Sequence, residues 1–142
     1  MKIEVSNGEI VDKLTILELK RENAQHYEQA RHIEEELNYL QPIVEGMDIP
    51  KELLTQLREV NKKLWEVEDM LREYEKTSNF GGQFITFARA VYQTNNARFK
   101  LKSKINEITN SRLVEEKIHP EKRNPVLLNN LLVLVTSSFV RR

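Results

Sequence analysis

Two pairs of acidic residues are the first in this sequence whose types and spacing could do chemistry. Glu9 and Asp12 form one pair, and Glu66 and Asp69 form another. Residues three apart share one face of a helix, so each pair would present both carboxylates on the same side. If the two helices faced each other, the four carboxylates could bind Mg²⁺, which prefers oxygen ligands. The simpler interpretation, which we favour, is that Glu9 caps its helix and the other three are solvated or ion-paired.

A second group combines cations, amides and one indole close to the expected helix seams. Such side chains could line a pocket for a phosphorylated or sugar-like ligand. The residues we assign to this ligand site are Lys13, Trp65, Arg89, Tyr92 and Asn96. The alternative is structural, because Arg89 and Arg98 could instead pair with acids inside the bundle. The acids on offer are Asp12, Glu18, Glu66 and Asp69. We favour ion pairing for Arg98 and a site role for Arg89.

Two further motifs carry weaker signals. Residues 79–82 end in two glycines before an expected helix, where backbone amides could hold an anion. No P-loop lysine follows them, so a plain turn is the favoured interpretation. The three histidines, His26, His32 and His119, do not have the spacing of metal ligands. The sequence supports no arrangement of nucleophile, histidine and acid.

The helices that must carry these residues can be read from apolar spacing. Ser6 and Glu9 match a capping box, so a first helix should begin there. Apolar residues three and four apart continue it to Leu40, and Pro42 and Gly46 should end or bend it. At 1.5 Å per residue, this helix would be a rod of roughly 50 Å.

The second helix carries an unbroken heptad-like seam of the kind found in coiled coils. Its seam residues are Leu53, Leu57, Val60, Leu64, Val67, Leu71 and Tyr74. A third helix should follow a break at 77–82 and carry apolar residues from Phe84 to Ile108. Short connections between long helices favour antiparallel neighbours. The sequence therefore predicts an all-α fold: a long antiparallel three-helix bundle with heptad-like seams, a short extended N-terminus and an irregular C-terminal tail.

The predicted bundle domain covers residues 1–117, and the tail covers 118–142. The tail contains an apolar run at 131–135. This run could form a strand beside residues 3–5, or dock on the bundle or on a partner subunit. An exposed apolar strand would invite aggregation, so we expect it to be covered.

Composition narrows the classes of function. Lysine plus arginine and aspartate plus glutamate both number 22, so the net charge is zero and gives no general attraction to nucleic acid. The chain has no cysteine, which excludes disulfides, thiolate zinc sites and a cysteine nucleophile. It also shows no signal-peptide core and no apolar run long enough to span a bilayer. We expect a cytoplasmic protein without a membrane span.

Several segments are distinctive when taken together: residues 5–18, 64–69, 87–92, Asn106 and 113–117. They resemble an uncharacterised bacterial family, known only as a domain of unknown function. The first segment, VSNGEIVDKLTILE, is the most specific part, and the likeness covers roughly residues 1–117. The resemblance implies no established activity and no catalytic residues. It implies a setting beside glycosyltransferases of surface-polysaccharide synthesis, and the tail after His119 departs from the family pattern.

Two functions from different classes follow. The leading interpretation is a binding or scaffold protein without a cofactor, which self-associates, most simply as a homodimer, and binds a protein partner or a phosphorylated sugar. The alternative is a Mg²⁺-dependent enzyme acting on a nucleotide or sugar phosphate. Its paired acids resemble those of the all-α nucleoside triphosphate pyrophosphohydrolases, although in that class the pairs lie closer in sequence. Convergence of the four carboxylates would favour the enzyme.

Overall fold

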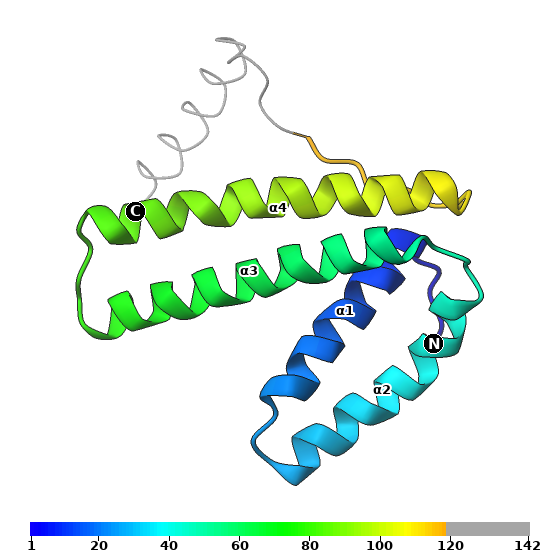
Figure 1. Cartoon of the computed structure of the whole chain (residues 1–142), viewed down its shortest axis with the longest axis horizontal. Helices are drawn as coiled ribbons and strands as arrows, with labels where there is room; N and C mark the ends of the chain where they lie inside the picture. Colours follow the sequence, from blue (N-terminus) through cyan, green and yellow to red (C-terminus); the bar gives the residue numbers. More distant parts are fainter. Residues whose placement is uncertain (119–142) are drawn as a thin grey trace, which may run out of the picture.

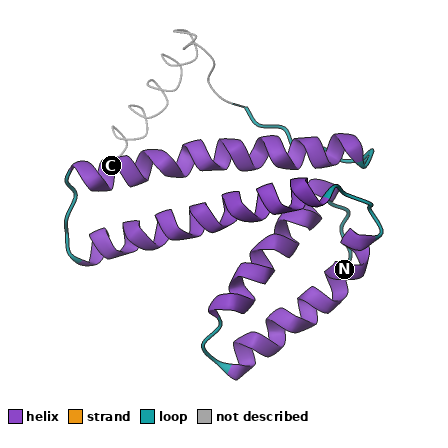
Figure 2. Ribbon diagram, in the orientation of Figure 1, coloured by secondary structure: helices purple, strands orange, loops and turns teal. Residues whose placement is uncertain are grey.

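The computed structural model describes residues 1–118, and in that range the chain forms four α-helices and no strand (Figures 1 and 2). They are α1 (Asn7–Asn23), α2 (Tyr27–Glu45), α3 (Lys51–Lys76) and α4 (Gly82–Ile108). The predicted all-α class is therefore confirmed. The apolar run at 131–135, which we expected to form a strand or to dock, lies outside the described residues. Of the four helices, none is both long and apolar enough to cross a membrane.

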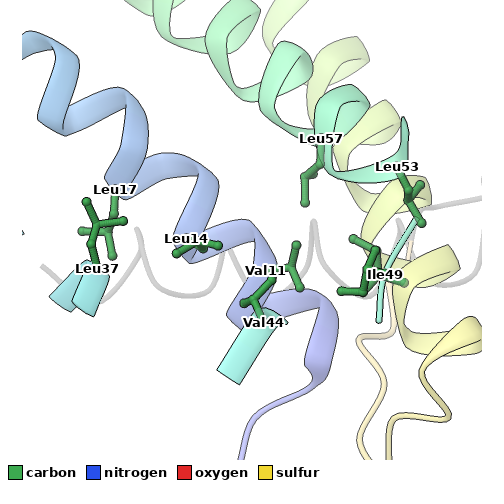
Figure 3. Close-up of a cluster of buried hydrophobic side chains, with 9 residues drawn as sticks. Val11, Leu14, Leu17, Leu37, Val44, Ile49, Leu53 and Leu57 are labelled. Atoms are coloured by element: carbon green, nitrogen blue, oxygen red, sulfur yellow. The ribbon is translucent and has the colours of Figure 1, made fainter. Parts of the chain in front are cut away.

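The prediction of three helices is wrong, because the expected first helix breaks into α1 and α2. Ala24 and His26 adopt extended backbone angles between the two helices. The side-chain amide of Asn23 (Nδ2) donates to the Leu19 carbonyl at 2.8 Å near the end of α1. The chain then turns back, and Leu37 of α2 packs beside Leu17 of α1 (Figure 3). Packing the apolar face of α2 against that of α1 is more favourable than continuing one helix as a rod of roughly 50 Å.

The helix ends follow local signals in the sequence. The Ser6 hydroxyl accepts a hydrogen bond from the Glu9 amide at 3.3 Å, which is half of the expected capping box. The Glu9 carboxylate does not complete the box, since it binds Lys102 of α4 instead. At the end of α3, Ser78 takes a positive φ of 51° and the Asn79 amide donates to the Tyr74 carbonyl at 2.9 Å. This closure turns the chain into α4.

The four helices form two antiparallel hairpins, α1–α2 and α3–α4, which meet near one end of the longer hairpin and diverge from there (Figure 1). Helix α1 packs against the other three helices, whereas α2 packs against α1 and no other helix of the described range. The buried apolar residues lie where the hairpins meet (Figure 3). The largest cluster comprises Val11, Leu14, Leu17, Leu37, Val44, Ile49, Leu53, Leu57 and Ile105. Leu19, Leu64 and Val67 are buried outside this cluster.

The other end of the α3–α4 hairpin, residues 68–93, is here called the distal arm. No residue of this arm is buried. Its two helices still pair with each other, and the rings of Tyr74 and Phe87 lie 5.9 Å apart. Neither α1 nor α2 reaches along it (Figure 1). Two helices alone cannot bury an apolar seam completely, so the arm keeps large apolar side chains in contact with solvent.

Candidate functional site

The start of α1 is held against the end of α4 by polar contacts to its backbone. The Gly8 amide donates to Asn106 Oδ1 at 2.6 Å, and the Asn7 amide donates to Ser111 Oγ at 3.0 Å. A Cβ atom on Gly8 would lie 2.5 Å from the carbonyl oxygen of Lys102. Only glycine lets the two helices approach this closely. This contact brings the acidic residues of the first turns of α1 onto α4.

Asp12 is the centre of a buried polar network between α1, α3 and α4, which we call the junction. Its side chain is 2% exposed and accepts from Arg98 Nε at 2.8 Å and from Asn61 Nδ2 at 2.9 Å. A second bond from Arg98 Nη2 makes the Arg98 contact two-pronged. Asn61 also donates to Thr15 Oγ1 at 2.9 Å. The burial is tolerated because both carboxylate oxygens have partners, the condition for a stable buried charge.

Lys102 is the second cation of the junction and is more deeply buried than Arg98, with a side chain 8% exposed against 25%. Its ammonium contacts Glu9 Oε2 and Glu115 Oε2, each at 2.6 Å. Burial alone would lower the pKa of Lys102, but hydrogen bonds to Glu115 and Glu9 outweigh it and raise the pKa above its ordinary value. The bond to Asp12 likewise raises the pKa of Arg98. Both side chains therefore stay charged throughout the physiological range.

Residues 109–118, here called the covering segment, lie over this part of α4. Asn110 takes a positive φ of 48°, which turns the chain back after α4. Glu115 then reaches Lys102, and Lys117 Nζ donates to Asn96 Oδ1 at 2.6 Å. The same ammonium lies 5.6 Å from the centre of the Phe99 ring. A cavity of about 340 Å³ remains between the segment and α4.

The four carboxylates considered for magnesium are not gathered in one place. Glu9 and Asp12 lie at the junction, but each is bound to a cation. Glu66 is exposed on α3, and Asp69 pairs with Arg72 at 2.7 Å on the surface. Within residues 1–118, no group of three or more histidine, aspartate and glutamate side chains could hold a metal ion.

The five residues assigned to a ligand site lie in different surroundings. Lys13 pairs with Glu36 at 3.2 Å and lines an open groove of about 780 Å³ between α1 and α2. Trp65 is half-buried on α3. Arg89 and Tyr92 are exposed on the α4 side of the distal arm. Asn96 lies beside the junction and accepts a hydrogen bond from Lys117 of the covering segment.

Sequence reasoning missed four residues of the junction: Thr15, Asn61, Lys102 and Glu115. A signal for Asn61 existed, because it lies on the same seam as Leu57 and Leu64, where a polar side chain needs a buried partner. Lys102 follows Arg98 by one helical turn and therefore shares its face. No spacing could have found Glu115, because its position depends on the turn at Asn110.

The fold and the junction define a class: an all-α chain of two hairpins held together by a buried network of charges. The chain belongs to the family described as Family of unknown function (DUF6165), whose model matches residues 1–125. The resemblance to a family of unknown function is therefore confirmed. The match continues to residue 125, past His119, where we expected the chain to depart from the family pattern. No curated protein and no solved structure matches the chain.

Proposed function

We propose that this protein is a non-enzymatic scaffold that assembles with a second copy of itself through the distal arm. The observation that carries the proposal is the absence of any buried residue between positions 68 and 93, in an arm rich in large apolar side chains. Ile85 and Tyr92 are 56% and 55% exposed, and Met70 and Phe80 are exposed as well. A large apolar side chain contributes about 1.5–3 kcal/mol when fully buried, so a partner surface would gain much from covering them.

The charge pattern of α4 supports an interface on the same arm. Charged residues make up 31% of the chain, yet Arg89 is the single charged residue between Gly82 and Ala97. The solvent-facing side of this half-helix carries Ile85, Ala88 and Tyr92, spaced three and four apart. Depletion of charge with enrichment of aromatic and aliphatic residues is typical of the centre of protein interfaces.

A second copy is the partner that suits this surface. Two antiparallel arms packed face to face would complete a four-helix bundle, which is the usual solution for a helical hairpin with an uncovered seam. A two-fold axis would place the same surface on both sides. Each arm also carries both signs of charge at its edges, with Arg89 on α4 and exposed acids such as Glu73 on α3. An arm can therefore complement its own copy.

The junction supports a structural role for the buried charges. Asp12, Arg98 and Lys102 are bound to each other or to neighbouring carboxylates and amides. No buried side-chain nitrogen or oxygen in the described residues lacks a hydrogen-bond partner. The magnesium-dependent alternative would need clustered carboxylates, and the described range holds no such cluster.

The resemblance to proteins found beside glycosyltransferases supports a finer form of the proposal. In this form, the dimer is a cytoplasmic scaffold for enzymes of surface-polysaccharide synthesis. A chain without cysteine suits a reducing compartment.

Static light scattering of the full chain tests the proposal. We expect a mass twice the 16.8 kDa of one chain at micromolar concentration. Ile85→Glu should reduce the mass to that of one chain, because it places a carboxylate in the interface. Tyr27→Glu is the matched control, since Tyr27 is more exposed but lies on α2, and it should leave the mass unchanged. A wild-type chain that runs as a monomer would defeat the proposal.

Cross-linking locates the interface independently, because the chain has no cysteine of its own. Ala88→Cys should join two copies through a short bifunctional maleimide. A cysteine placed at Tyr27 should not do so. Cross-linking of Tyr27→Cys and not of Ala88→Cys would show that the chain self-associates through the α1–α2 hairpin, and would contradict an interface on the distal arm.

A further inference from the structure

A small polar cavity lies between α4 and the covering segment, apart from the distal arm. Its volume is about 340 Å³, at the lower end of the range for small-molecule sites. The lining residues are Asn95, Arg98, Phe99, Lys102, Glu115 and Lys117. Three of these side chains are cations and one is a carboxylate, so the lining is strongly positive in a chain whose net charge is zero.

Arg98 is the fixed donor of this cavity. Asp12 holds its Nε and Nη2 atoms from behind, which sets the plane of the guanidinium. The remaining nitrogen, Nη1, has only a long contact of 3.4 Å to Asn95 Oδ1. A guanidinium oriented by a buried carboxylate keeps its free edge ready for an anion without losing side-chain entropy on binding.

Lys117 supplies a second donor at the edge of the cavity. Its ammonium has three hydrogens, and Asn96 accepts one of them at 2.6 Å. The Phe99 ring lies beside it and forms an apolar wall. Arg98 and Lys117 therefore approach the same space from α4 and from the covering segment.

Charge balance identifies Glu115 as the replaceable member of the cluster. The cations are Arg98, Lys102 and Lys117, and the carboxylates behind them are Glu9 and Asp12. These five groups leave one positive charge, which Glu115 balances through Lys102. Asp12 and Glu9 belong to α1, whereas Glu115 belongs to a segment without helical structure. An anion that enters the cavity can take the place of the Glu115 carboxylate at little electrostatic cost.

We propose that the cavity binds a phosphate group, which displaces Glu115 from Lys102 and contacts Arg98, Lys102 and Lys117. A phosphate offers more acceptor oxygens than a carboxylate, and so can satisfy all three cations at once. The volume leaves room for a small substituent beyond the phosphate, with Phe99 as its wall. The site thus takes inorganic phosphate or a small phosphate monoester.

Isothermal titration calorimetry on the full chain tests this site. The probes are inorganic phosphate, glycerol phosphate and glycerol, which separate free phosphate from a phosphorylated small molecule. We expect heat from both phosphates and none from glycerol. A lower dissociation constant for glycerol phosphate than for inorganic phosphate would assign the site to phosphate monoesters. The reverse order would assign it to the free phosphate ion. No heat from either phosphate would overturn the proposal.

Variants make the result specific to the cavity. Lys117→Ala should weaken phosphate binding by about tenfold, the effect of losing one charge-assisted hydrogen bond. Glu115→Gln should strengthen it, because the competing carboxylate is gone. Lys104→Ala is the matched control, since Lys104 is exposed on α4 and does not line the cavity.

Two variant outcomes would also overturn the proposal. If Lys104→Ala weakened binding as much as Lys117→Ala, the attraction would be a general effect of surface charge. If Glu115→Gln weakened binding, Glu115 would support the ligand and not compete with it. Glu115 and Lys117 lie outside the helices, and an unchanged helical circular dichroism spectrum of each variant would show that the fold persists.

Discussion

The junction and the distal arm are opposite ends of the same helix pair, α3 and α4, and they differ in how far the seam between the two helices is buried. At the junction, α1 covers the pair, and the seam contains Asn61, Arg98 and Lys102 in a network with α1. In the arm no third helix of residues 1–118 covers the pair, and the seam is apolar with no buried residue. We expect the buried charges to favour this arrangement of helices, because an arrangement that separated them would leave a charge unpaired. The arm has no such device, and its apolar surface is open to a second copy.

Removal of the central carboxylate should give the largest loss of stability. Asp12→Ala leaves Arg98 without its buried partner, and we expect a loss of about 3–5 kcal/mol in the free energy of unfolding. Asp69→Ala in the arm is the contrast, since its pair with Arg72 is exposed and should contribute about 1 kcal/mol or less. Urea denaturation of both variants measures the difference. Equal losses would mean that the junction is no more important to stability than a surface pair.

A double-mutant cycle would refine this result. Arg98→Ala alone should also be strongly destabilising, because it leaves the Asp12 carboxylate buried and unpaired. The double variant should then lose much less than the sum of the two single losses. Additive losses would show that the two residues stabilise the protein independently.

The next largest effect should come from crowding between α1 and α4. Gly8→Ala places a Cβ atom against the Lys102 carbonyl, so the helices must separate, and we expect a cost of about 1–3 kcal/mol. Gly82→Ala is the matched control at the start of α4, because a Cβ there meets nothing within 4 Å. Thermal melts that place both variants at the same midpoint would contradict the close approach at Gly8.

A smaller effect is expected at the N-terminal cap of α1. Ser6→Ala removes the oxygen that accepts from the Glu9 amide, and should cost about 1 kcal/mol. Because Glu9 binds Lys102 and does not complete the capping box, Glu9→Gln should act through the junction and not through the cap. Denaturant melts of the two variants, alone and combined, should therefore give additive losses.

The sequence was sufficient to predict the elements that depend on local rules. Of the seven seam residues predicted for α3, Leu53, Leu57, Leu64 and Val67 are buried, and the other three are partly buried. The cap at Ser6 also follows from residues that are neighbours in the chain. The break at Ala24 could not be predicted, because no glycine or proline marks it and the packing of α2 on α1 decides it.

The candidate site depended on contacts that local rules do not reach. Asp12 and Arg98 were both singled out, but their pairing joins α1 to α4 across most of the chain. Lys13, Arg89 and Tyr92 have the right residue types for a ligand site but lie on other surfaces. The cavity forms only when the covering segment turns back at Asn110, a consequence of backbone geometry after α4.

Hydrogen exchange of the wild type and of Ile85→Glu, measured by mass spectrometry at one protein concentration, tests the contrast between the two regions most directly. If a second copy covers the arm, amides of residues 68–93 should exchange faster in the variant, because they open more readily once the arm is uncovered. Amides of the junction, in α1 and in the second half of α4, should be unchanged. Arm amides that exchange equally in both proteins would contradict the account, as would a variant in which arm and junction lose protection together.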